Sequence, residues 1–278
     1  MRRTFKTLAL AGIAAVAIAV STAIPAQAAP RLNASTYVAL GDSYSSGALL
    51  GGNLDQACDR SSAAYPVLLA GGTHFVSFKA CSGATIADTL ALLPTVPRPN
   101  VKVVTLTVGF NDTHWTAAVD ALLAGNSSAA QAYLSLTSAE ISGPVAAQIQ
   151  LLISALGDAY PKATIYWGGY VQQFGPGADP NGMCTFAFGN PSAPTPASIP
   201  NWLAAYMDGI VSLMNGVIEA DVLAARSAGV PITYVNADSQ FMGQRSCNNP
   251  TPAVFNLHPT VAGQLLYARA FKAAGAEK

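Results

Sequence analysis

The sequence is poor in charge and in histidine. Only 10% of its 278 residues are charged, and Lys plus Arg equal Asp plus Glu at 14 each. Without an excess of basic residues, neither nucleic acid nor an anionic membrane is an expected partner. There are only three histidines, and no two of the four cysteines form a Cys-x-x-Cys pair. We therefore expect neither a metal site nor a cofactor.

Long apolar runs are also missing after the N-terminal segment. Basic residues precede an apolar run from Leu8 to Val20, and Ala26-Gln27-Ala28 matches a cleavage site of small residues. We interpret residues 1–28 as a signal peptide and residues 29–278 as a single domain that is secreted. No later run is long and apolar enough to span a membrane, so stable membrane insertion is not expected. A domain of this size can bury one large core, and we expect a monomer.

The cysteine count is even, which in an exported protein indicates disulfides. Four cysteines allow three ways of forming two bonds. We prefer the pairing of neighbours in the sequence, Cys58 with Cys81 and Cys184 with Cys247. Each bond would close a long loop and contribute about 3 kcal/mol in the chain-entropy model.

Strand and helix patterns alternate along the chain. Apolar and β-branched runs predict strands at residues 37–40, 74–78, 101–108, 163–167 and 232–235. Helical patterns occupy residues 63–70, 85–93, 115–139 with a break at 125–126, 145–160, 202–228 and 260–274. Segments rich in Gly, Pro and Asn predict loops at 47–62, 172–200 and 236–257. The repeated order predicts an α/β fold with a five-stranded, mostly parallel sheet and helices on both faces.

Three of the predicted strands end in short corners of small and polar residues. The first strand breaks at Gly41-Asp42 and is followed by Ser43, while Gly83 and Asn111 follow the second and third strands. In a parallel sheet the carboxyl ends of the strands share one edge, where open α/β folds bind ligands. Ser43, Gly83 and Asn111 are therefore expected to meet, although an ordinary turn serine would look the same in isolation.

A nucleophilic serine needs a base, and only three histidines are available. His74 begins a predicted strand and is expected at the surface, and His114 is expected to have a local polar role. His258 directly precedes Pro259, a residue favoured at the first position of a helix, so we expect His258 to cap the last helix. A helix N-terminus disfavours a charged imidazole and would keep the ring able to accept a proton.

Four blocks carry a resemblance to a known family. Gly41-Asp42-Ser43-Tyr44-Ser45, Gly83, Gly109-Phe110-Asn111-Asp112 and His258-Pro259 occur in the order typical of the SGNH/GDSL hydrolases. The chain resembles their secreted, disulfide-bearing bacterial lipase, esterase and phospholipase branch. The resemblance implies a three-layer, flavodoxin-like α/β/α fold. No Gly-x-Ser-x-Gly occurs, which argues against an α/β-hydrolase elbow.

The resemblance also implies roles for particular residues. Ser43 would be the nucleophile and His258 the general base. The oxyanion donors would be the amides of Ser43 and Gly83 together with the Asn111 side chain. The family's aspartate three residues before the histidine is replaced here by Phe255. Some relatives use a backbone carbonyl instead, which Phe255 or Asn256 would supply.

The nearby aspartates are expected to be structural. Asp42 and Asp112 would bond the amides of their own corners, as Asp does in turns. No acidic residue lies between Asp238 and Glu277, so no local carboxylate is available to orient His258. A Ser–His dyad is therefore our interpretation.

The function implied is hydrolysis of an acyl or lipid ester through an acyl-enzyme, of the lipase, esterase or phospholipase A type. A carbohydrate deacetylase of the same fold and a catalytically silent binding module are the alternatives. Aromatic and apolar loop residues favour an acyl chain, unless they only pack the loop itself: Phe174, Met183, Phe186 and Phe188. Arg60 and Arg245 are the cations available for a phosphate head group.

Overall fold

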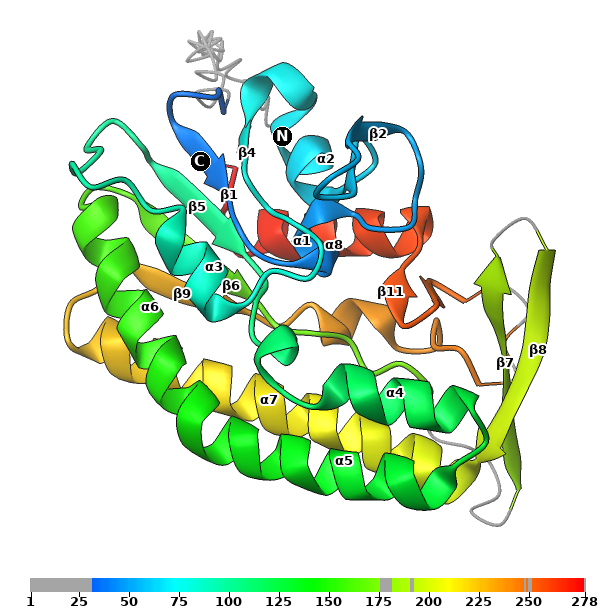
Figure 1. Cartoon of the computed structure of the whole chain (residues 1–278). Helices are drawn as coiled ribbons and strands as arrows, with labels where there is room; N and C mark the ends of the chain where they lie inside the picture. Colours follow the sequence, from blue (N-terminus) through cyan, green and yellow to red (C-terminus); the bar gives the residue numbers. More distant parts are fainter. Residues whose placement is uncertain (1–31, 176–181, 191–192, 248, 250–251, 278) are drawn as a thin grey trace, which may run out of the picture.

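The computed structural model describes residues 32–175, 182–190, 193–247, 249 and 252–277. A central sheet lies between two groups of helices (Figure 1). The predicted signal peptide, residues 1–28, lies outside the described residues.

The main sheet has five strands, all parallel, in the order β4-β1-β5-β6-β9. The strands are β1 (Tyr37–Ala39), β4 (Ser77–Phe78), β5 (Val103–Leu106), β6 (Thr164–Gly168) and β9 (Ile232–Val235). The chain first adds β4 on one side of β1 and then adds β5, β6 and β9 on the other. This reversal of direction leaves a crevice at the carboxyl ends of β1 and β5. The α/β prediction is confirmed.

Helices cover both faces of this sheet (Figure 1). The helices are α1 (Ser43–Ser46), α2 (Tyr65–Ala70), α3 (Ile86–Ala91), α4 (Trp115–Leu123), α5 (Ser127–Glu140), α6 (Ala146–Ala159), α7 (Asn201–Ser227) and α8 (Val261–Ala273). Helices α2 and α8 pack against each other on one face, while α3, α6 and α7 form the layer on the other. Short 3₁₀ turns at Thr73–Phe75, Phe110–Asp112 and Asp238–Phe241 complete the connections.

Helices α5 and α6 are continuous through a π-turn at Ile141–Val145 that contains Pro144. Proline lacks the N–H of an α-helical bond, and the wider turn accommodates it without ending the helix. The resulting run, Ser127–Ala159, is long and apolar enough by composition to cross a membrane. The expectation that no later segment meets this test was wrong. In the structure this run packs against α3, α4 and α7.

The predicted loop at 172–200 is partly wrong, because it contains an antiparallel hairpin of β7 (Met183–Asn190) and β8 (Ala193–Pro200). Its prolines had suggested a loop. Pro194, Pro196 and Pro200 are spaced by even numbers, so their missing N–H groups fall on one edge of β8. An edge strand tolerates proline in that arrangement, and β8 pairs only with β7 among the described strands.

Two other expected loops contain short hairpins. β2 (Asn53–Asp55) pairs with β3 (Arg60–Ser61), and β10 (Val254–Phe255) pairs with β11 (His258–Pro259). The second strand of the sheet is shorter than predicted, because His74 lies in the 3₁₀ turn before it, exposed at the surface.

Two disulfides tie the loops to this frame. Cys58 bonds Cys81, which joins the β2–β3 hairpin to the corner after β4. Cys184 of β7 bonds Cys247, which joins the β7–β8 hairpin to the segment before β10. These are the two bonds preferred from the sequence.

Candidate active site

Ser43 is the first residue of α1, directly after the corner that ends β1. Asp42 caps this helix, and its Oδ1 accepts a hydrogen bond from the Tyr44 amide at 3.0 Å. Gly41 has φ +113°, and a Cβ there would lie 2.2 Å from the Thr107 carbonyl oxygen. Only glycine allows β1 and the residues after β5 to approach this closely. The corner therefore holds the Ser43 hydroxyl at the edge of the sheet.

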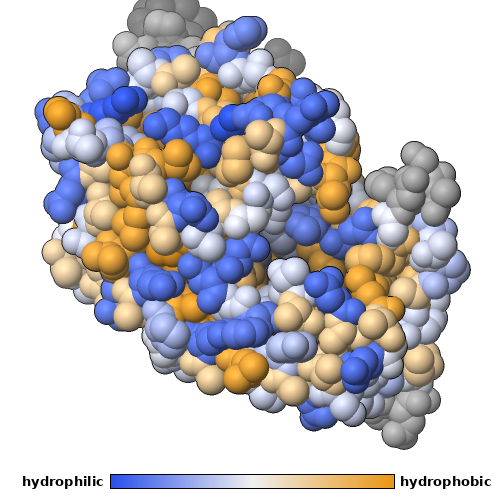
Figure 2. Space-filling model, in the orientation of Figure 1, coloured by the Kyte–Doolittle hydropathy of each residue, from blue (hydrophilic) through white to orange (hydrophobic). Residues whose placement is uncertain are grey.

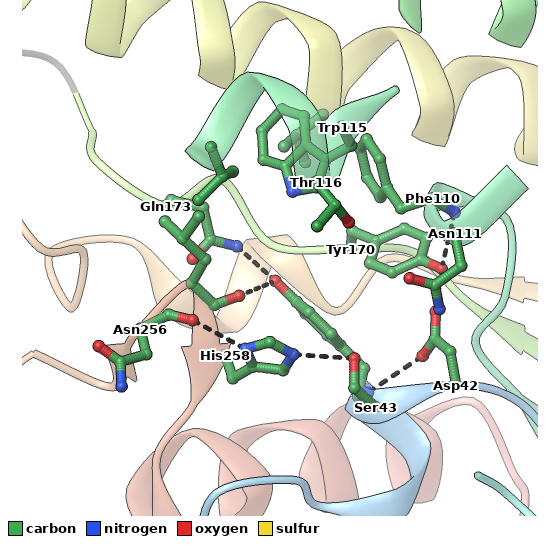
Figure 3. A pocket seen from close by; sticks show the side chains of 14 residues that line it. Asp42, Ser43, Phe110, Asn111, Trp115, Thr116, Tyr170, Gln173, Asn256 and His258 are labelled. Carbon is green, nitrogen blue, oxygen red and sulfur yellow. Dashed lines mark hydrogen bonds between the residues drawn. The ribbon is translucent and has the colours of Figure 1, made fainter. Parts of the chain in front are cut away.

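His258 lies beside this hydroxyl, with Nε2 2.8 Å from Ser43 Oγ (Figure 3). The histidine is on β11 and does not cap α8, so that expectation was wrong. The cap is Thr260, whose Oγ1 accepts a bond from the Gly263 amide, and α8 begins at Val261. Pairing of Val254 with Pro259 holds the histidine strand in an extended conformation before the helix starts.

The other ring nitrogen faces a backbone carbonyl. His258 Nδ1 lies 2.8 Å from the Asn256 carbonyl oxygen, so the carbonyl fixes a proton on Nδ1 and leaves Nε2 as an acceptor. Of the two residues named from the sequence, the structure places Asn256 at this nitrogen. Phe255 instead pairs with His258 across the hairpin. Desolvation lowers the pKa of His258 below its ordinary value, against the opposing effects of the Asn256 carbonyl and Asp59.

Asp42 is buried beneath the corner and faces away from the imidazole. Its carboxylate accepts hydrogen bonds from the hydroxyls of Thr107, at 2.9 Å, and Tyr170. Burial raises the pKa of Asp42 to about 6, although these hydrogen bonds oppose the shift. Asp112 connects two corners, because its two oxygens lie 3.0 and 3.1 Å from the Ile86 amide nitrogen. Burial likewise raises the pKa of Asp112 to about 6.

Asn111 lines the same cavity as Ser43 and His258. Its Nδ2 donates to the Ala84 carbonyl at 3.0 Å, so the third corner is bonded to the second. Gly83, with φ +82°, lies beside Ala84 and lines a neighbouring depression with Cys58 and Cys81. Within the described part of the chain, no backbone acceptor is bonded to the Gly83 amide.

The cavity at Ser43 is polar at the nucleophile and apolar farther in. Its volume is about 150 Å³, and its apolar wall is formed by Phe110, Trp115, Val119, Val211 and Leu257. Engineered protein cavities of about this volume bind a molecule of the size of benzene. The sequence did not identify this wall. A helix was expected around Trp115 and Val119, and residues four apart lie on one face of a helix. The sequence did not indicate that this face would turn toward Ser43.

The loop aromatics named from the sequence lie elsewhere. Phe174 and Phe186 are buried against each other with ring centroids 5.2 Å apart, and Phe188 contacts Phe186. Phe186 and Phe188 lie on β7, and Phe174 lies on the segment before the hairpin, while Met183 is exposed. The alternative that these residues pack their own segment fits the structure better than a role in holding an acyl chain.

Neither Arg60 nor Arg245 is among the residues that line the cavity at Ser43. Arg60 pairs with Asp55, and Arg245 pairs with Asp238 at 2.8 Å. Asp238 also accepts a bond from the Gln172 amide, which explains its position without a catalytic role. His114 bonds Glu140 at the surface, in the local polar role expected. No group of three or more potential metal ligands occurs among the residues that the structure describes.

Comparison with known proteins agrees with this geometry. Residues 39–266 match the model of the GDSL-like Lipase/Acylhydrolase family. A lipase of Streptomyces rimosus is 30% identical over 260 residues, which is 89% of each chain. The crystal structure of an extracellular lipase from that organism gives a TM-score of 0.69 at 27% identity, over 87% of this chain and all of that one. Phospholipase A1 from Streptomyces albidoflavus NA297 gives 0.68 at 25% identity, over 86% and 99% of the two chains. The chain belongs to the GDSL-like lipase/acylhydrolase family and is a carboxylic ester hydrolase.

Proposed function

We propose that this hydrolase cleaves acyl esters of lipids through a Ser43–His258 dyad. Ser43 Oγ attacks the ester carbonyl carbon while its proton passes to His258 Nε2. The tetrahedral intermediate collapses to an acyl-enzyme, and the alcohol leaves with the proton from His258. Water then attacks the acyl-enzyme with His258 again as base, which releases the fatty acid and restores Ser43.

The observation that carries the proposal is the line of hydrogen bonds from Ser43 to His258 to the Asn256 carbonyl. The carbonyl accepts the Nδ1 proton, so Nε2 has its lone pair directed at the serine. Desolvation lowers the pKa of His258, which keeps the imidazole neutral before attack. A base in this state is ready to accept a proton at neutral pH.

The oxyanion is assigned to three donors: the amides of Ser43 and Gly83 and the Asn111 side chain. Asn111 Nδ2 carries two protons, and only one is needed for its bond to the Ala84 carbonyl. That bond fixes the amide group, while the second proton can be given to the oxyanion. A donor held in place before the reaction needs no reorganisation in the transition state.

Two apolar surfaces support a lipid substrate. The cavity walled by Phe110, Trp115 and Val119 suits a short segment of an acyl chain. On the other side of His258, a wider depression is lined by Leu49, Ala187, Pro194 and Val261 (Figure 2 shows hydrophobic side chains beside a hollow on this face). That surface suits an apolar alcohol part of the ester.

The names of two relatives, a lipase and a phospholipase A1, agree with a lipid substrate. The proposed substrate is a lipid or another small acyl ester. Residues 1–28 would be removed as a signal peptide, leaving residues 29–278 as one secreted, monomeric domain.

Substitution of the nucleophile tests the proposal. Ser43→Ala should abolish hydrolysis of p-nitrophenyl butyrate, since it removes the attacking oxygen and little else. Ser82→Ala, at an exposed serine in the corner after β4, should leave the rate unchanged. Full activity of a folded Ser43→Ala protein would refute the dyad. Complete lack of turnover by the wild-type chain would favour a binding module, and release of acetate only from acetylated saccharides would favour a deacetylase.

The dyad also predicts that no third acidic residue is catalytic. Asp238→Asn should keep kcat within about tenfold, as expected for an ordinary hydrogen-bond change. A triad aspartate loses about ten-thousandfold on the same change. A folded Asp238→Asn protein with a loss of that size would replace the dyad by a triad.

A further inference from the structure

The side chain of Asn256 has a separate partner from its carbonyl. Its Oδ1 accepts a hydrogen bond from the Gly189 amide at 2.8 Å, and its Nδ2 donates to the Gly189 carbonyl at 2.7 Å. Gly189 is near the end of β7, far from Asn256 in the sequence. One residue thus joins the histidine to the β7–β8 hairpin: its carbonyl faces His258 and its amide group pairs with the hairpin.

The pairing uses an edge of β7 that β8 leaves free. In an antiparallel pair, every second residue turns its N–H and C=O away from the neighbouring strand. Gly189 is opposite Pro194, which has no N–H to donate. Both backbone groups of Gly189 bond the Asn256 side chain and so face away from β8, in the pattern that a further strand would require. The carboxamide of Asn256 carries one acceptor oxygen and a donor NH2 group side by side, and it satisfies both backbone groups.

The turn that carries the Asn256 carbonyl needs support. Asn256 and Leu257 have φ of 49° and 59°, so both central residues of the β10–β11 hairpin are left-handed. Two-residue hairpins of this kind favour Asn followed by Gly, and leucine is unfavourable there. A bulky residue in this region costs about 1–3 kcal/mol and persists only when its surroundings hold it.

Contacts hold the turn from both sides. Tyr44, the residue after the nucleophile, donates its hydroxyl to the Leu257 carbonyl at 3.0 Å. Gln173 donates in turn to the Tyr44 hydroxyl. The Asn256 side chain provides the contact on the hairpin side. The Cys184–Cys247 disulfide ties the same hairpin to the segment that leads into β10.

We propose that Asn256 is a positioning residue whose side chain, docked on Gly189, fixes the carbonyl that orients His258. The β7–β8 hairpin thereby takes over the orienting task of the carboxylate that this chain lacks. A carbonyl has no negative charge and stabilises an imidazolium less than a carboxylate would. The carbonyl can orient His258 only if it is held in place, and its contact with the hairpin through the Asn256 side chain holds it. The inference rests on the proposed function, because it assigns His258 as the base.

Asn256→Gly is the sharpest test. Glycine keeps the backbone carbonyl and is at ease with a positive φ, so the variant removes only the bonds to Gly189. We expect kcat to fall about 10- to 100-fold, by analogy with the loss of partners that orient metal-binding histidines, with KM changed less than threefold. The Nδ1 proton of His258, followed by NMR, should exchange faster with solvent than in the wild type.

The matched control is Thr185→Val. Thr185 also lies on β7, but its hydroxyl bonds only the exposed Ser198 across the hairpin, at 2.9 Å. This variant should keep both kcat and the Nδ1 signal. Asn256→Asp retains an acceptor for the Gly189 amide but loses the donor to its carbonyl, and its kcat should fall between those of the wild type and Asn256→Gly.

The inference is overturned if Asn256→Gly keeps kcat within twofold and retains a slowly exchanging Nδ1 proton. Failure of the proposed function has a different result, since Ser43→Ala would then remain active. The NMR signal reports the orientation of His258 in either case. Equal losses in Asn256→Gly and Thr185→Val would also reject the inference, because they would indicate general loosening of the hairpin.

Discussion

At the scale of single residues, the proximity of the candidate site residues could be predicted from the sequence, and the contacts that hold them in place could not. Ser43, Asn111 and His258 stand in short blocks at the ends of predicted strands or before a helix, so the sequence alone indicates that they meet. The bonding of the Asn256 side chain to Gly189 could not be predicted. It depends on the backbone groups of Gly189 that do not pair with β8, and therefore on the β7–β8 hairpin. The prolines of β8 led to the prediction of a loop in place of this hairpin.

The lowered pKa of His258 predicts how kcat/KM for ester hydrolysis depends on pH. The dyad is active when the imidazole is neutral, so kcat/KM should fall as pH drops through the pKa of the free enzyme. Desolvation lowers this pKa below the ordinary 6.5, so the acid limb should have its midpoint below pH 6.5. Hydrolysis of a neutral p-nitrophenyl ester from pH 4 to pH 9 measures it. A midpoint above 6.5 would indicate that a negative charge, such as that of Asp59, dominates the site.

At the scale of elements, the regular units were predicted well and the irregular ones poorly. Helices such as α7 and the buried strand β5 have long apolar patterns that local sequence specifies. The start of α8 was displaced because pairing of β11 with β10 overrides the helix-initiating tendency of Pro259. Such pairing is a tertiary contact, which a local pattern does not contain.

The two disulfides should differ in their contributions. Cys184 and Cys247 are 63 residues apart, and Cys58 and Cys81 are 23 apart. The chain-entropy model gives about 4 kcal/mol for the longer loop and about 3 kcal/mol for the shorter one. Replacing each pair by serine and measuring urea unfolding should therefore destabilise the Cys184/Cys247 variant more. The reverse order would mean that strain or residual structure outweighs loop length.

At the scale of the whole molecule, the order of strand and helix predicted the architecture. Crossover connections through helices give an all-parallel sheet with both faces covered. The reversal of strand order at β1 and β5 puts the candidate active site at the carboxyl ends of these two strands. The signal peptide and the monomeric state remain predictions. The geometry of the cavity at Ser43 could not be predicted, because its wall combines α4 and α7, which are distant in the sequence.

The free energy of unfolding should depend on pH because the carboxyl group of Asp42 is buried. Burial raises the pKa of Asp42 from 3.8 to about 6, so between these values the folded state binds more protons than the unfolded state. The free energy of unfolding therefore loses a contribution as pH rises through this window. Asparagine does not titrate. The stability of Asp42→Asn relative to the wild type should thus improve by about 2–3 kcal/mol from pH 3.5 to pH 7.5.

Urea denaturation of both proteins at these two pH values measures the difference. The variant can be less stable at both, because it disturbs the bonds from Tyr44, Thr107 and Tyr170. Only the change with pH in the stability difference between the two proteins reports the raised pKa of Asp42. A difference that stays constant with pH would mean that Asp42 is ionised at its ordinary pKa.

The prolines of β8 affect the tendency of the protein to aggregate at high protein concentration. The residues of β8 that turn their backbone away from β7 are 194, 196, 198 and 200, and three of them are proline. Only Ser198 among them has an amide proton to offer to an approaching strand. Exposed edges with regular donors invite edge-to-edge aggregation, and proline on the edge suppresses it. At high protein concentration this hairpin should therefore not recruit other copies of the chain into a shared sheet.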